Sequence, residues 1–292
     1  MVNIELSWPA ATVAAGALGV TAVGLRISRR PRLAGAAVVA QETALLFGLF
    51  ALWQFAGSFA ILGPGGALAR SRWIWHFERV IQLPSETALQ RIFLPHPLVI
   101  QFVNIYYASL HFPVLIGCLI WLFVAHRDRY AQMRTTLVVF TGACLLIQLI
   151  PVAPPRMLPS TGMVDTAVQY GQSVYATHSG FDPDQLSAMP SVHVGWAILV
   201  AIMVISAARS RWRWLAVLYP VMTTLAVVVT ANHFWLDGIV AAIVLGAVLL
   251  IQAGVRRLIA RRHQLSAPAV SQLPEARASR TATSPVDSGS AG

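Results

Sequence analysis

Three short motifs in the second half of the chain contain residue types that together can transfer a phosphoryl group. They are APPRMLP with Arg156, MPSVHVG with Ser191 and His193, and NHFWLD with His233 and Asp237. His233 and Asp237 are four residues apart, so they share one face of any helix that begins at or before His233. The carboxylate can then accept the imidazole N–H, which leaves the other ring nitrogen as a nucleophile or base.

The remaining motif residues suit the binding of an anion and the transfer of a proton. Arg156 is always charged and offers a fork of donors that matches phosphate. A helix N-terminus beside Ser191 adds unpaired N–H groups, and Pro190 suits its first turn. His193, at the same helix start, is placed to be a second histidine in its acid form. The set predicts phosphoryl transfer through a phosphohistidine, and we expect neither a metal site nor another cofactor.

The composition predicts that these motifs belong to an integral membrane protein. Of the 292 residues, 57% are hydrophobic and only 11% are charged, against roughly a quarter charged in soluble domains. The net charge of +10 could indicate a nucleic-acid partner, but the arginines stand in short clusters between apolar runs, as membrane topology requires. We therefore expect no nucleic-acid binding. All 21 basic residues are arginine, which is typical of a GC-rich, bacterial genome.

Seven apolar segments are long enough to cross a bilayer, which needs about 20 residues. The second and third exceed that length and are expected to tilt or to project, and the last two form a tight helical hairpin. Cys118 and Cys144 fall inside the segments and are expected to be buried free thiols. The segments are 9–26, 34–62, 97–125, 134–153, 189–208, 213–231 and 235–255.

The distribution of arginine orients these segments. Sixteen of the 21 arginines lie in the first, third and fifth connections and after the last segment, and five lie in the other connections. By the positive-inside rule the first group is cytoplasmic, so in the cell membrane the N-terminus is outside and the C-terminus is cytoplasmic. Arg156, His193 and His233 then share the extracytoplasmic face at similar depth. This shared depth predicts that they form one site.

The pattern predicts four parts of the chain. Residues 1–63 hold two N-terminal transmembrane helices, and residues 97–255 hold the catalytic core. Residues 64–96 are too polar to span and mix aromatic with charged residues, which predicts extracytoplasmic amphipathic helices at the membrane interface, with Ser85 at the start of the second. Residues 256–292 are rich in Ser, Ala, Pro and Thr, so a disordered cytoplasmic tail is expected.

The order Arg…Ser-x-His…His-x-x-x-Asp resembles the three motifs of the type-2 phosphatidic acid phosphatase (PAP2) superfamily. APPRMLP, MPSVHVG and HFWLD, with NIYYASLHFPV before them, are most similar to the branch that includes inositol-phosphorylceramide synthase and sphingomyelin synthase. The resemblance covers about residues 75–250 and implies an all-α polytopic fold with a six-helix core. The roles it implies are nucleophile for His233, general acid for His193, orientation of the nucleophile for Asp237, and phosphate binding for Arg156 and Ser191.

Three positions depart from the phosphatase pattern. Leu149 and Val227 stand where that pattern has Lys and Arg, and Val192 stands where it has Gly. Two cationic phosphate ligands are therefore missing, as in much of the synthase branch. We expect a transferase that acts on a lipid phosphate ester, with a polyol such as inositol as the first acceptor to consider. A lipid phosphatase that uses water, and a non-catalytic membrane protein that retains the fold, are the alternatives.

Other polar residues near the motifs allow two interpretations. Asn104, Tyr107 and His111 fall on one face of a helix, either as an interhelical hydrogen-bond seam or as a wall of the substrate cavity, and the family likeness favours the cavity for His111. Glu42 is expected to have a structural pairing partner. The connection 154–187 has the length of a lid or head-group pocket. Its polar residues are individually expected to be solvated: Asp165, Tyr170, Tyr175, His178, Asp182 and Asp184.

Overall fold

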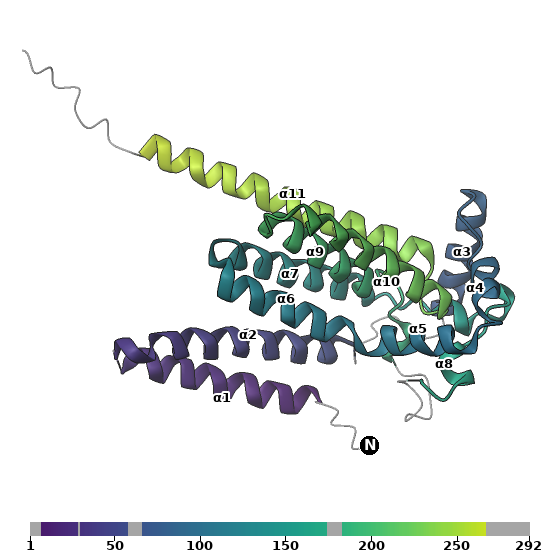
Figure 1. The fold of residues 1–292 in the computed structure, drawn as a ribbon, viewed down its shortest axis with the longest axis horizontal. Helices are drawn as coiled ribbons and strands as arrows, with labels where there is room; N and C mark the ends of the chain where they lie inside the picture. The colour runs from purple at the N-terminus through teal and green to yellow at the C-terminus, as the bar shows by residue number, and fades with distance from the viewer. Residues whose placement is uncertain (1–6, 29, 58–65, 174–182, 267–292) are drawn as a thin grey trace, which may run out of the picture. The chain divides into compact units, whose positions relative to one another are not determined.

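The computed structural model describes residues 7–28, 30–57, 66–173 and 183–266 (Figure 1). Within them every regular element is a helix, and the only extended pairing is an isolated bridge between Val152 and Ser187, so the all-α prediction is confirmed. Residues Met1–Leu250 form one compact unit and Ile251–Gly292 a second. Among the described residues, five helices are long and apolar enough to cross a membrane, and the number is six if a bent pair of helices is counted as one span. The chain is therefore a multi-pass membrane protein.

The first two helices, α1 (Trp8–Ile27) and α2 (Ala34–Gly57), pack against each other as an antiparallel hairpin (Figure 1). Arg30 precedes Pro31, which begins the short helix η1, and it is extended with φ −81° and ψ 116°. A residue before proline avoids the helical region, so α1 and α2 stay separate helices. The second predicted segment, to residue 62, ends outside the described residues.

The predicted segment 97–125 is not one continuous helix, which corrects the sequence analysis. It forms α5 (Pro97–Ser109) and α6 (His111–Ala125), which are bent by 51° relative to each other. Pro113 accounts for the bend, because it has no N–H to donate to the carbonyl of Ser109 and its ring crowds that carbonyl.

Four further helices of the bundle follow: α7 (Arg127–Gln148), α9 (Val192–Ala207), α10 (Leu218–Val229) and α11 (Trp235–Ser266). α9 has 16 residues and is shorter than the predicted span. α10 begins later than predicted, because residues Arg211–Val217 form the 3-10 helix η6 before it. α11 continues through residues 256–266, which the sequence analysis placed in the tail, and residues 267–292 lie outside the described residues.

The connection between α7 and α9 holds four short elements: η3 (Pro155–Met157), η4 (Pro159–Thr161), α8 (Thr166–Gln169) and η5 (Pro183–Leu186). Tyr175, His178 and Asp182, expected above to be solvated residues of this connection, lie outside the described residues. The peptide bond between Met189 and Pro190, just before α9, is cis.

Two short helices form in the segment predicted to be amphipathic. α3 (Ala67–Val80) and α4 (Glu86–Phe93) are joined by a short turn, and Ser85 starts α4 as predicted, because its Oγ accepts the N–H of Ala88 at 3.2 Å. Their faces are arranged with the acids inward: Glu78 and Glu86 are almost completely buried, whereas Trp73 is 63% exposed. Both acids therefore point into the protein, whereas Arg72, His76 and Arg91 are exposed together with Trp73.

Close packing of α7 against α9 depends on Gly195. A Cβ at this position would overlap the ring of Phe140 and lie 2.6 Å from its Cε1. Phe140 belongs to a buried core built from α6, α7, α9 and α11, together with Leu199 and Leu245. Because Gly195 lies two residues after His193, this contact also sets the position of the second motif.

Two predictions away from the motifs are confirmed. Glu42 on α2 pairs with Arg134 on α7 and accepts the hydroxyl of Tyr130 at 2.9 Å, so it has a structural partner. Cys118 and Cys144 are buried free thiols.

Candidate active site

A tight turn between α10 and α11 presents the third motif. The N–H of Asn232 donates to Val227 at 3.0 Å and the N–H of Ala231 donates to Val228 at 2.9 Å, which are the two bonds of a Schellman motif. Ala231 has φ +57°, where glycine is usual, and this left-handed conformation costs an alanine roughly 1–2 kcal/mol. The turn directs the chain from the end of α10 through His233 into α11.

His233 and Asp237 are paired as the sequence predicts. Nδ1 of His233 lies 2.7 Å from the carbonyl oxygen of Ala188 and 3.2 Å from Oδ2 of Asp237. Both partners are acceptors, so Nδ1 carries the proton and Nε2 keeps its lone pair. Oδ2 of Asp237 also accepts the N–H of Phe234 at 2.9 Å, and both side chains of the pair are buried. The imidazole is thus held in one tautomer and orientation, as a nucleophile at Nε2 requires.

His193 lies in the first turn of α9 and is surrounded by other rings. Its ring centroid is 4.7 Å from that of Tyr107, 4.7 Å from that of His111 and 5.9 Å from that of His233. Its ring nitrogens take no hydrogen bond from the described residues. They are therefore available to exchange a proton with a molecule that sits beside His233.

Ser191 connects the second motif to the third. Its Oγ caps α9 by accepting the N–H of Val194 at 3.4 Å, and its own N–H donates to the carbonyl oxygen of Asp237 at 3.1 Å. This second bond ties the first turn of α9 to that of α11, so the two histidines are held relative to each other. The cap uses only a lone pair of the hydroxyl, so its hydrogen can still donate to a phosphate oxygen.

Arg156 in η3 is bound to the same turn. Its N–H donates to the carbonyl oxygen of Ala231 at 3.0 Å, and its guanidinium donates to Oδ1 of Asn232. Nε of this buried side chain lies 3.3 Å from Oδ2 of Asp165. Asp165, which was expected to be a solvated loop residue, is 29% exposed and is also the anionic partner of the arginine. It caps α8 by accepting the N–H of Val168 at 3.0 Å.

The loop before α9 is anchored so that the carbonyl of Ala188 faces His233. The N–H of Ala188 donates to the carbonyl oxygen of Val152 at 3.1 Å. At the end of α7, Nε2 of Gln148 donates to the carbonyl oxygen of Pro190 at 3.0 Å. Bonds on both sides of Ala188 therefore fix the acceptor that holds the imidazole of His233.

Asn104, one of three residues predicted to line a cavity, is instead saturated with hydrogen bonds. Its Nδ2 donates to the carbonyl oxygen of Thr166 at 3.1 Å and to Oε1 of Gln172 at 2.9 Å, and its Oδ1 accepts the hydroxyl of Thr166 at 2.8 Å. It is 1% exposed. Asn104 thus tethers α8 to α5, which agrees with the hydrogen-bond seam that was the other interpretation.

Tyr107 and His111 both contact the second catalytic candidate. Their rings flank His193 from the two sides of the break between α5 and α6. His111 is 3% exposed, and its Nδ1 lies 3.2 Å from the hydroxyl of Tyr219 on α10. These two residues therefore belong to the wall around His193.

Sequence reasoning misses the partners whose positions depend on the path of the backbone. The residue type of Ala188 does not reveal the role of its carbonyl, because every residue has a main-chain carbonyl. Asn232 stands inside the quoted motif NHFWLD, so it could have been included, but its bond to Arg156 follows only from the Schellman turn. Tyr219 is 108 residues from His111 and has no motif of its own.

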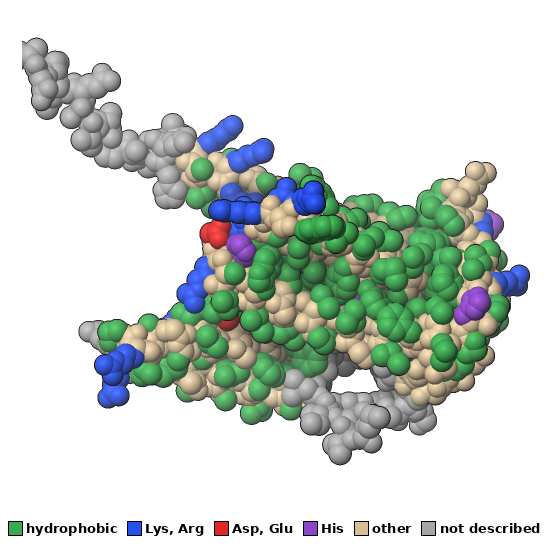
Figure 2. Space-filling model, in the orientation of Figure 1, with side chains coloured by type: hydrophobic (Ala, Val, Ile, Leu, Met, Phe, Trp, Pro, Cys, Tyr) green, Lys and Arg blue, Asp and Glu red, His purple; other side chains and the backbone are tan. Residues whose placement is uncertain are grey.

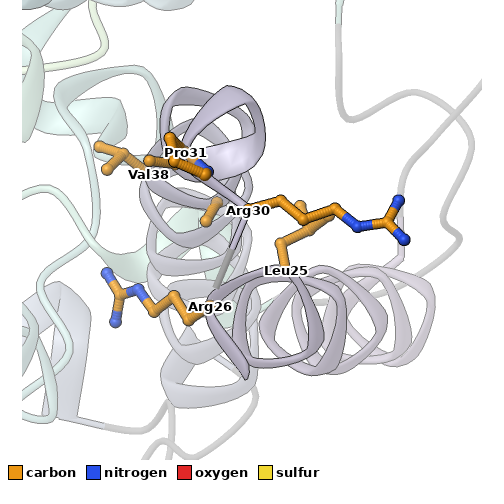
Figure 3. Close-up of a pocket in the computed structure, with 7 residues that line it drawn as sticks. Leu25, Arg26, Arg30, Pro31 and Val38 are labelled. Atoms are coloured by element: carbon orange, nitrogen blue, oxygen red, sulfur yellow. The ribbon is translucent and has the colours of Figure 1, made fainter. Parts of the chain in front are cut away.

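A groove of 310 Å³ at the connection of α1 and α2 lies apart from these motifs. It is lined by Leu25, Arg26, Arg30, Pro31, Ala34, Ala37 and Val38. Figure 3 shows the guanidinium groups of Arg26 and Arg30 pointing away from each other, so they do not converge on one anion. Elsewhere, the part of the chain that the structure describes holds no group of three His, Cys, Asp or Glu side chains arranged for a metal ion.

The three motifs thus meet at one place, with Arg156, His193 and His233 drawn together by bonds between η3, the start of α9 and the α10–α11 turn. A family model described as the PAP2 superfamily matches residues 72–251. Neither the curated proteins nor the solved structures gave a match. The family match covers more than half of the chain and includes every motif residue, so this protein belongs to the PAP2 superfamily.

Proposed function

We propose that the protein is a membrane-embedded phosphotransferase that moves a phosphoryl or phospho-alcohol group from a lipid phosphate ester to an alcohol, through a phosphohistidine at His233. Membership of the PAP2 superfamily supports phosphatase or phosphotransferase chemistry in general. The observation that carries the proposal is the acceptance of the Nδ1 proton by both Ala188 and Asp237. This arrangement makes Nε2 the basic nitrogen of the ring and keeps it free for attack.

In the first half-reaction, Nε2 of His233 attacks phosphorus while the bond from phosphorus to the lipid alcohol breaks. His193, in its protonated form, gives its proton to the departing oxygen. The phosphohistidine ring is now positively charged at Nδ1–H. The Ala188 carbonyl and the Asp237 carboxylate already accept this N–H and stabilise the charge without rearrangement.

In the second half-reaction, the hydroxyl oxygen of the acceptor attacks phosphorus and the bond from phosphorus to Nε2 of His233 breaks. Neutral His193 takes the proton of that hydroxyl, so both histidines return to their starting protonation states. Arg156 and the hydroxyl of Ser191 are the donors for the phosphate oxygens in both steps, while Asn232 holds the guanidinium of Arg156. None of these transfers uses a metal ion, which a chelator tests directly.

The charge beside Arg156 favours a phosphodiester donor. Asp165 partly offsets the guanidinium at 3.3 Å. Leu149 and Val227 occupy the positions at which the phosphatase pattern has cations, and Val227 is 1% exposed within α10. A dianionic phosphomonoester would bring a second charge into a site of low polarity, whereas a phosphodiester carries one. This supports a lipid phosphodiester as donor.

The burial of the site favours an alcohol over water as acceptor. Ser191 and Asp237 are fully buried and His233 is 5% exposed. A site that excludes water protects a phosphohistidine from hydrolysis until an acceptor fills the space. Inositol is the first acceptor to test, because the motifs are most similar to the branch with inositol-phosphotransferase chemistry.

The orientation in the membrane is part of the proposal. Within Met1–Leu250, Figure 2 shows basic side chains gathered where α1 meets α2 and where α6 meets α7, the end of the bundle away from the α10–α11 turn of Figure 1. The positive-inside rule then supports a cytoplasmic position for that end and an extracytoplasmic position for the site.

The test is turnover by purified protein in lipid nanodiscs that contain phosphatidylinositol or phosphatidic acid, with and without an added polyol. We expect transfer from the phosphodiester to the polyol, an acid-labile phosphoenzyme, and loss of both in His233→Ala. The matched control is Tyr130→Phe, which removes one hydroxyl on α7 far along the chain from the motifs. Release of inorganic phosphate alone would favour the lipid phosphatase. Loss of turnover when a chelator is added would contradict metal-independent chemistry. An absence of turnover on every lipid would favour the non-catalytic alternative.

A further inference from the structure

The first turn of α11 is capped from another helix. Phe234 precedes the helix in the N-cap position and has no polar side chain to accept the free N–H groups that every helix start presents. The N–H of Phe234 donates to Asp237 at 2.9 Å, within the turn. The N–H of Leu236 donates to Oε1 of Glu78, on α3, at 2.7 Å. Glu78 therefore supplies the cap that the local sequence lacks.

Glu78 shares a buried place with a second acid, Glu86 on α4. Glu78 is 0% and Glu86 is 1% exposed, and Nη2 of Arg79 lies 2.6 Å from Oε2 of Glu86 and 4.0 Å from Oε2 of Glu78, so the two carboxyl groups are neighbours. Oε1 of Glu78 is used by Leu236, and Oε2 of Glu86 accepts Nη2 of Arg79 at 2.6 Å. The oxygens left for the contact, Glu78 Oε2 and Glu86 Oε1, have no N–H or hydroxyl donor in the described part of the chain. Two carboxyl oxygens bind each other only when one carries a proton.

The neighbouring charges decide which acid holds that proton. Nη2 of Arg79 lies 2.6 Å from Glu86 and 4.0 Å from Glu78, too far to hydrogen-bond the latter. The carboxylate of Asp237 approaches Glu78 from α11. Glu86 is thus stabilised as a carboxylate by Arg79, while Glu78 faces two anions.

The turn between α3 and α4 also binds Trp235, the residue before Leu236. Nε1 of Trp235 donates at 2.9 Å to the carbonyl oxygen of Pro84, in the turn between α3 and α4. Arg79 donates to this carbonyl at 3.2 Å as well. Two consecutive residues at the start of α11 are therefore bound to the α3–α4 turn and its acids. His233 is two residues before Trp235 and shares the turn that they fix.

We propose that Glu78 is a positioning residue: as a protonated carboxyl group hydrogen-bonded to Glu86, it holds the first turn of α11, and with it the ring of His233, in the geometry of the site. The effect on turnover rests on the proposed function, whereas the protonated acid and the held turn do not. Deprotonation would put three carboxylates, from Glu78, Glu86 and Asp237, around one buried space with Arg79 as the only nearby cation among the described residues.

The pKa of Glu78 sets the pH range over which its carboxyl group is protonated and holds the first turn of α11. Burial, the hydrogen bond to Glu86 and its negative charge raise the pKa of Glu78 from 4.5 to about 9, and these causes outweigh the N–H of Leu236, which lowers it. The carboxyl group is then protonated at neutral pH and ionises near pH 9. Glutamine reproduces the protonated form at every pH, because its oxygen can accept from Leu236 and its amide can donate to Glu86.

The kinetic test compares wild type, Glu78→Gln, Glu78→Ala and the control Glu42→Gln, which neutralises a paired acid on α2. We expect wild-type and Glu42→Gln kcat to fall as pH rises through about 9, and Glu78→Gln to retain most of the neutral activity without that fall. Glu78→Ala should lose about 100-fold in kcat, the scale of a 1 Å misplacement. An alkaline fall in Glu78→Gln equal to that of wild type would overturn the proposal, even if Glu78→Ala does not fold.

A second readout does not depend on turnover. Infrared spectra at neutral pH should show the carbonyl band of a buried protonated carboxyl group in wild type and Glu42→Gln, and no such band in Glu78→Gln. Amide exchange at Leu236 should accelerate beyond its normal pH dependence above pH 9 in wild type and Glu42→Gln, but not in Glu78→Gln. If no lipid is turned over, the proposed function fails, but these spectra still test the role of Glu78. A carbonyl band that is unchanged in Glu78→Gln would overturn the proposal that Glu78 is protonated.

Discussion

Oδ2 of Asp165 lies 3.3 Å from Nε of Arg156, so the guanidinium assigned to phosphate binding already has an anionic partner. A substrate phosphate must compete with this carboxylate for the same donors. Because Asp165 belongs to the connection between α7 and α9, the competition also couples substrate binding to that connection.

Asp165→Asn should therefore bind substrate more tightly. Removing a partly exposed charge partner is worth up to about 1 kcal/mol, or about fivefold in KM, and asparagine still caps α8. The gain should be larger for phosphatidic acid than for a phosphodiester, because the monoester has the greater negative charge. Steady-state kinetics on both lipids checks this, with Asp128→Asn, which removes an exposed acid beside Arg129, as control. An unchanged ratio of the two KM values would contradict competition by Asp165.

Asp237→Asn should slow the reaction without abolishing it. The Ala188 carbonyl at 2.7 Å still selects the Nδ1–H tautomer, so the variant loses the charge that stabilises the phosphohistidine and not the orientation of the ring. We expect a fall of about 100-fold in the rate of phosphoenzyme formation, measured in a single turnover, against complete loss in His233→Ala. A loss equal to that of His233→Ala would show that Asp237, and not Ala188, selects the tautomer.

The sequence predicts which side chains come together at this site better than it predicts the backbone that holds them. His233 and Asp237 could be paired because a spacing of four residues places both on one helical face, and they are 3.2 Å apart. The residue types of Ser191 and His193, before an apolar run, likewise indicate a helix start. The carbonyl of Ala188 could not be predicted, because a main-chain acceptor is the same in every residue and its direction depends on tertiary contacts.

Two errors have physical causes that are visible in the sequence only in retrospect. Residues 97–125 are hydrophobic throughout, so they were predicted as one helix although they contain Pro113. Pro113 cannot donate a hydrogen bond to the carbonyl of Ser109, four residues earlier, and the helix is bent there. The second is an omission: the segment of α3 and α4 was predicted to be amphipathic, but not to bury Glu78 and Glu86. A lipid-facing helix can expose its apolar side, so amphipathicity alone does not say which face points inward.

Gly195→Ala should destabilise the protein through overpacking. The new methyl group would overlap the ring of Phe140, and relief requires that α9 move away from α7. We expect a loss of about 1–3 kcal/mol, read from thermal or denaturant unfolding in detergent, and partial recovery in the double variant with Phe140→Leu. Gly142→Ala is the matched control, because a Cβ there meets nothing within 4 Å. Equal stability of the two single variants would argue against close packing at Gly195.

The free energy of unfolding should decrease as pH rises, because Glu78 ionises differently in the folded and unfolded states. Its pKa is 4.5 in the unfolded chain and about 9 in the folded protein, so between these values the folded state holds one proton that the unfolded state has lost. The number of protons bound by the unfolded minus the folded state is then negative, and the free energy of unfolding decreases as pH rises. The contribution is fully present below pH 4.5, declines up to about pH 9 and is constant above it. Glu78→Gln cannot titrate, so unfolding midpoints measured from pH 5 to 10 should show a shallower decline for this variant than for wild type. Parallel curves for the two proteins would mean that Glu78 ionises alike in both states.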